Sequence, residues 1–130
     1  MTDALIGLGL AATTMGGARL AGLDRDGAFY PTVLVVVALL YVLFGAVDGR
    51  PEVVASETAT ALVFVAVAVA GFKHSPWWLV AGFALHGGWD VVHDTVVSND
   101  GVPAWWPELC LAYDFAVAAW LTVRTRAASV

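Results

Sequence analysis

The chain has 130 residues, of which 60% are hydrophobic and 13% are charged, and its formal net charge is −5 at pH 7. Soluble domains carry about 25% charged residues, so this composition excludes an ordinary water-soluble domain. The mean hydropathy of +0.80 indicates membrane-spanning helices instead. Each span needs about 20 apolar residues, and five spans with tight turns use the whole length. We therefore predict one transmembrane helical domain, 1–130, with membrane lipid as its partner and no nucleic-acid partner.

The first predicted span is Ala4–Leu23. Its apolar stretch is interrupted by Arg19, whose long side chain can reach the membrane interface. A cleaved secretory signal is not expected, because Asp3 stands where such signals carry a basic residue. If this segment lies on the membrane surface instead, the protein has four spans. Four glycines on it suit close helix packing, within the chain or in a homo-oligomer: Gly7, Gly9, Gly16 and Gly17.

Four further spans follow, each introduced by a polar turn that contains glycine or proline: Ala28–Val47, Val53–Phe72, Trp77–Val97 and Trp105–Val123. Pro31 falls in the first turn of its span, where a missing N–H costs little. Tryptophan pairs open the last two spans, as expected for aromatic belts at membrane interfaces. The predicted fold class is therefore all-α, an integral membrane bundle of five transmembrane helices.

The distribution of Lys and Arg predicts the orientation of this bundle. Cytoplasmic loops of membrane proteins carry an excess of these residues. Side one, which includes the N-terminus, receives only Arg50, so we place the N-terminus outside the cytoplasmic membrane and the C-terminus inside. The other side receives Arg19, Arg25, Lys73, Arg124 and Arg126.

The fourth span carries a polar face that needs an explanation. An ionisable group at the middle of a span costs about 2.5–3.5 kcal/mol on insertion scales. At 100° per residue, the four ionisable side chains of this span fit within an arc of about 100°. These side chains belong to His86, Asp90, His93 and Asp94.

Other spans place polar side chains at the same depths. Counting 1.5 Å per residue from the outer end, the depths are about 6 Å for Glu57 and His93, 10 Å for Asp90, 14 Å for Asp114 and 16 Å for His86. Tyr41 on the second span is about 10 Å deep, level with Asp90. Cys110 lies one turn above Asp114 on the same face. We expect the polar faces of three helices to converge in the outer half of the membrane.

Histidines and carboxylates in this arrangement suit a divalent metal, with zinc or iron favoured, because magnesium and calcium prefer all-oxygen sites. His86 and His93 are about 10 Å apart along the helix, too far to bind one ion together. Either His93, Glu57 and Asp90 hold one metal and His86 with Asp114 supports it, or there are two metal positions. Cys110 is interpreted as a small buried hydrophobic residue. The predicted metal residues are His86, His93, Asp90, Glu57, Asp114 and Asp94.

Three functions are compatible with this pattern. A metal-dependent enzyme would act on a lipid or another hydrophobic substrate, with a remaining carboxylate as general base. A proton- or cation-handling protein would use the same side chains as a relay, but the inner half of the spans offers few polar residues. A structural membrane subunit would use them as a hydrogen-bonded polar core.

Three sequence strings carry a resemblance to a known group of proteins. They are Arg25 to Pro31, the H-G-G-W-D-V-V-H motif from His86 to His93, and Gly101 to Pro107. The chain resembles an uncharacterised family of small prokaryotic multi-pass membrane proteins with an H-G-x-W-D-x-x-H-like helix motif. The resemblance covers nearly the whole chain after the first span. It implies a multi-pass membrane fold, and it carries no established activity.

Overall fold

The computed structural model describes residues 1–128, and within this range the secondary structure consists of five α-helices without a strand. The predicted all-α class is confirmed, and each predicted segment overlaps one helix, with shifts at the ends. The helices are α1 (Thr2–Ala21), α2 (Phe29–Asp48), α3 (Pro51–Lys73), α4 (Trp77–Val96) and α5 (Trp106–Ala128).

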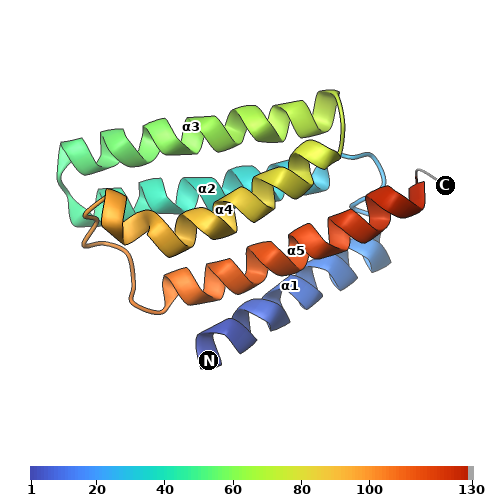
Figure 1. Ribbon diagram of the computed structural model, residues 1–130, viewed down its shortest axis with the longest axis horizontal. Coiled ribbons are helices and arrows are strands. Elements are labelled where there is room, and N and C mark those ends of the chain that lie inside the picture. Colours follow the sequence, from blue (N-terminus) through green and yellow to red (C-terminus); the bar gives the residue numbers. More distant parts are fainter. Residues whose placement is uncertain (129–130) are drawn as a thin grey trace.

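Successive helices run in opposite directions, and α1 lies alongside α5 (Figure 1). The N-terminus, the α2–α3 turn and the α4–α5 loop meet at one end of the bundle, which we call the outer end (Figure 1). The helix α4 is central, because it contacts α2, α3 and α5. Its polar face is therefore surrounded by other helices.

Short turns with defined backbone conformations produce this antiparallel order. Gly22 ends α1 with φ of 73°, and Gly49 ends α2 with φ of 91°, left-handed conformations that glycine adopts without a steric penalty. Pro51 opens α3, where its missing N–H would have had no helical partner.

The bundle has an apolar surface and a partly polar interior, the reverse of a water-soluble protein. Large apolar side chains such as Leu43, Leu62 and Leu85 are more than half exposed. In a membrane these side chains face lipid, whereas polar groups need partners inside the protein. The buried polar and charged residues are Asp24, Glu57, His86, Asp90, His93, Asn99, Asp114 and Thr125.

Three of the helices, α1, α2 and α3, are long and apolar enough to cross a membrane. The first segment, which carries Arg19, is one of them. The other two helices, α4 and α5, carry the buried residues His86, Asp90, His93, Cys110 and Asp114. That α4 and α5 also cross the membrane stays a prediction.

The contact between α1 and α5 can be tested with two glycines of α1, Gly7 and Gly9. A Cβ atom on Gly7 would overlap the carbonyl oxygen of Leu109 on α5, whereas a Cβ on Gly9 would meet no atom within 4 Å. We expect Gly7→Ala to lower the stability by about 1–3 kcal/mol, as overpacking does. The control Gly9→Ala should leave it unchanged or slightly higher, because Ala favours helix more than Gly.

Thermal unfolding of both variants in detergent, followed by circular dichroism, measures this difference. Equal unfolding temperatures would contradict the close packing of α1 on α5.

Candidate metal centre

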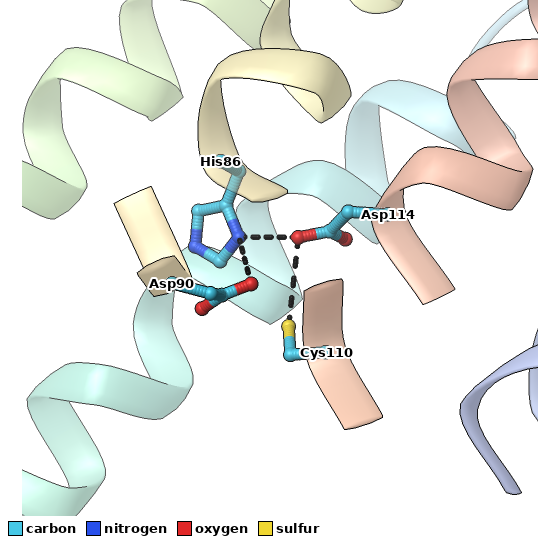
Figure 2. Close-up of side chains that lie close together, drawn as sticks. All are labelled: His86, Asp90, Cys110 and Asp114. Atoms are coloured by element: carbon cyan, nitrogen blue, oxygen red, sulfur yellow. Dashed lines mark hydrogen bonds and ion pairs between the residues drawn. The ribbon is translucent and has the colours of Figure 1, made fainter. Parts of the chain in front are cut away.

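Four potential metal ligands come from adjacent turns of two antiparallel helices (Figure 2). His86 and Asp90 are four residues apart on α4, and Cys110 and Asp114 are four residues apart on α5. Residues at this spacing lie on the same face of a helix, one turn apart. Because α4 and α5 pack together, the two pairs face each other inside the bundle.

The ligand atoms of these four residues are close together and fully enclosed. One atom from each residue lies within 4.8 Å of the others. His86 Nδ1 is 2.6 Å from Asp114 Oδ2 and 3.9 Å from Asp90 Oδ2. The Cys110 thiol is 3.5 Å from the same Asp114 oxygen. The side chains of His86, Asp90 and Asp114 are at most 1% exposed, so water does not screen their charges.

Two carboxylate oxygens in this group have no hydrogen-bond partner. They are Asp90 Oδ2 and Asp114 Oδ1, and both are buried. A buried polar atom without a partner costs about 1–3 kcal/mol, and more when the group is charged. The geometry therefore leaves acceptor capacity for one more group inside the cluster.

Tyr41 on α2, a third helix, contacts both Asp90 of the cluster and His93. Its hydroxyl donates a hydrogen bond of 2.6 Å to Asp90 Oδ1. Its ring stacks on the His93 ring, with centroids 4.2 Å apart. Tyr41 thus connects the four-residue cluster to a second polar group nearer the outer end.

The second group pairs His93 with Glu57 of α3. His93 Nε2 lies 3.0 and 2.8 Å from the two carboxylate oxygens, and Asn99 Nδ2 donates to Glu57 Oε2 at 2.9 Å. His93 Nδ1 lies 3.3 Å from Asp94, whose side chain is 76% exposed. Both Glu57 oxygens are therefore already hydrogen-bonded by protein groups. This group is a satisfied buried pair rather than an open site.

The α4–α5 loop covers the outer pair of His93 and Glu57, and Asn99 of this loop contacts Glu57 directly. Arg50 binds Asp48 through two hydrogen bonds of 2.8 Å and also donates to the Ser98 carbonyl at 2.9 Å. The hydrogen bond to Asp48 raises the pKa of the Arg50 guanidinium. The backbone N–H of Asp100 donates to Asp48 as well, at 2.7 Å. Gly101 packs so closely on the Phe44 carbonyl that a Cβ there would overlap it.

The expected convergence of the polar faces is confirmed. Glu57 meets His93 at one level, and Asp114 meets His86 at the next. The structure separates these contacts into two groups and places Asp90 with His86, not with His93 and Glu57. The arrangement with His93, Glu57 and Asp90 around one metal is therefore not observed. Metal binding by the predicted residues itself stays a prediction.

The sequence did not predict the roles of Cys110 as a potential ligand and of Asn99 as a partner of Glu57. Cys110 is buried, as interpreted, but it also lies beside Asp114 as a potential ligand. Its four-residue spacing from Asp114 was the available signal. Asn99 gave no signal, because it lies in a polar loop and only the folded chain brings it to Glu57.

Comparison of this chain with protein-family models, curated proteins and solved structures finds no match. The resemblance to small prokaryotic membrane proteins therefore stays a prediction.

The contribution of the pair of His93 and Glu57 to stability can be tested by substitution. His93→Leu leaves the Glu57 carboxylate buried with Asn99 as its remaining partner. Removing one member of a buried pair costs about 3–5 kcal/mol, so this variant should unfold at a much lower temperature. The double variant Glu57→Leu/His93→Leu should recover most of the loss, because no charge is left buried. Wild-type stability of the single variant would show that the pair does not form.

Proposed function

We propose that this protein is an integral membrane protein that binds one divalent metal ion through His86, Asp90, Cys110 and Asp114. One observation carries the proposal: four buried ligand atoms lie within 4.8 Å of one another. The two unpartnered carboxylate oxygens support it, since a cation among them would satisfy both.

The donor set fits a metal ion after a small adjustment. Bonds of about 2.0–2.3 Å to zinc place tetrahedral ligands about 3.3–3.8 Å apart. The contact of 2.6 Å between His86 and Asp114 would open, and the wider ones would close. Imidazole, thiolate and carboxylate together suit zinc first and iron second, whereas magnesium and calcium prefer oxygen ligands.

The proposed setting is the outer half of the cytoplasmic membrane. All five helices would cross it, with the N-terminus outside and the C-terminus inside, in accord with the distribution of Lys and Arg. Asp90, Cys110 and Asp114 lie in the half of their helix toward the outer end of the bundle, and His86 lies at the middle of α4. A metal ligand set there would be shielded from bulk water by the α4–α5 loop.

We propose further that the metal serves an enzyme acting on a lipid or another hydrophobic molecule. A catalytic zinc usually keeps three protein ligands and one open position for water or substrate. Asp90 is the best candidate for the ligand that water or substrate would displace during the reaction, because Tyr41 would keep hold of one of its oxygens. It would then act as general base beside the open position.

A relay across the membrane is less well supported. On the inner side of the cluster, the core is filled by the apolar side chains of Leu34, Phe83 and Val117, each with 0% exposure. Phe83 lies one turn inward from Gly87 on α4, and Val117 lies about one turn inward from Asp114 on α5. Such a layer interrupts any continuous line of polar groups.

Elemental analysis of the protein purified in detergent tests metal binding. Wild-type protein reloaded with zinc or iron should hold close to one equivalent, and His86→Ala should lose it. His74→Ala in the α3–α4 turn is the matched control and should keep the metal. His93→Gln, which retains a hydrogen-bonding side chain beside Glu57, should also keep it.

Loss of metal in His93→Gln but not in His86→Ala would move the site to the outer pair. Absence of metal from wild type after loading would overturn the proposal in favour of a hydrogen-bonded polar core.

Tyr41→Phe tests the role of the third helix. Removal of the hydroxyl leaves Asp90 Oδ1 without its donor, and loss of a partner that orients a metal-site carboxylate typically weakens affinity by about 10–100-fold. Competition with a chromophoric chelator measures the dissociation constant. Tyr113→Phe is the control, because its hydroxyl binds Thr14 on α1. Equal affinities of the two variants would exclude this role for Tyr41.

A further inference from the structure

A long apolar groove runs between α3 and α4 on the surface of the bundle. Its volume is about 690 Å³, and its lining is almost entirely apolar. The side chains of Val63, Leu85 and Val92 on its edges are exposed. The floor includes Gly88, where a Cβ atom would meet no atom within 4 Å, so the middle of the groove is open. Because α3 is apolar enough to span a membrane, this groove would face lipid chains.

The groove is separated from the candidate site by a thin wall. Thr60, Phe64 and Trp89 line the groove on one side and an enclosed gap on the other. The gap is also lined by Glu57 and His86, and it is too narrow to hold a water molecule. These three side chains therefore lie between the groove and the gap that Glu57 and His86 line.

Access from the aqueous outer end is blocked in this structure. Asn99 reaches down from the α4–α5 loop to Glu57, and the loop is tied to Asp48 and Arg50 by hydrogen bonds. His93 and Glu57, directly under the loop, are 0% and 1% exposed. A molecule that reaches His86 from the side of the membrane would not have to displace this covering loop.

We propose that the substrate of the metal site is an amphiphile with a long flexible hydrocarbon chain, and that this chain lies in the groove between α3 and α4. This inference rests on the proposed metal-dependent function. The polar end of the molecule passes the wall at Thr60 and Trp89 and reaches the ligand cluster at His86. The apolar groove recognises the chain by shape and hydrophobicity, and the buried polar groups recognise the head.

The polar gap behind the groove is the reason for choosing an amphiphile over a second copy of the chain. A helix packed on Gly88 and Ala84 would use their small size, which favours close helix contact. Such a partner would need no opening toward His86 and Glu57. An amphiphile has a chain that fills the groove and a polar end that would use the polar gap behind the wall once a wall side chain has moved.

Photolabelling tests the proposal. The probe is a long-chain fatty acid with a diazirine on its chain, added to metal-loaded protein in detergent, with labelled peptides mapped by mass spectrometry. Wild-type protein should be labelled on both walls of the groove, in α3 and α4. Gly88→Leu starts its side chain where a Cβ atom would meet no atom within 4 Å, so the leucine should occupy the groove and reduce this labelling at least tenfold.

The matched control is Gly9→Leu on α1, another glycine whose Cβ would meet no atom within 4 Å. Both variants replace glycine by a better helix former, so neither should unfold the protein. The control should keep wild-type labelling in the groove. Equal labelling of the two variants, or labelling spread evenly over all helices, would overturn the proposal.

Two further readouts separate this inference from the proposed function. Metal content is measured on the same samples, and Gly88→Leu should retain it. If Gly88→Leu retains its metal and its labelling is undiminished, the groove does not bind the chain, and the metal site is unaffected by this result. If wild-type protein holds no metal, the substrate assignment is overturned together with the metal site. Light scattering gives the mass: a wild-type dimer that Gly88→Leu converts to a monomer would make the groove a helix interface and overturn the proposal.

Discussion

The placement of α4 depends on the cost of leaving its ionisable face without hydrogen-bond partners. Each such group costs about 2.5–3.5 kcal/mol at the middle of a span unless it finds a partner. Three ionisable side chains of α4 are each hydrogen-bonded to a different helix. His86 pairs with Asp114 on α5, and His93 pairs with Glu57 on α3. Asp90 accepts a hydrogen bond from Tyr41 on α2. Three helices are thus hydrogen-bonded to the central one. The polar contacts determine which faces of the helices are left apolar on the surface of the bundle.

The two polar groups differ in whether their buried oxygen atoms all have hydrogen-bond partners. This difference distinguishes the group that stabilises the fold from the group that can bind a ligand. The pair of His93 and Glu57 is saturated by Asn99 and by its own hydrogen bonds. The cluster around His86 retains two buried oxygens without partners, on Asp90 and Asp114. Its low-dielectric surroundings strengthen the attraction of any cation placed among them. The outer pair therefore stabilises the fold, and the inner cluster is the part that can accept a ligand.

Helix periodicity and depth were enough to predict much of this arrangement. The spacing of His86, Asp90 and His93 on one helix face follows from the geometry of a straight helix. The same geometry places Glu57 level with His93, and Asp114 between Asp90 and His86. Sequence could not assign partners, because depth does not say which helices are neighbours. The separation into two groups, the role of Cys110 and the contact from Asn99 depend on lateral packing and on the path of a loop. These features required the folded chain.

X-ray absorption of metal-loaded, detergent-purified protein tests the central claim most directly, because it reports the atoms bound to the metal. A metal held by His86, Asp90, Cys110 and Asp114 would show a single sulfur at about 2.3 Å together with nitrogen or oxygen ligands at about 2.0–2.2 Å. The sulfur would be that of Cys110, which is the sole cysteine of the chain. A zinc or iron spectrum without sulfur, or one that is unchanged in Cys110→Ser, would contradict the site described here.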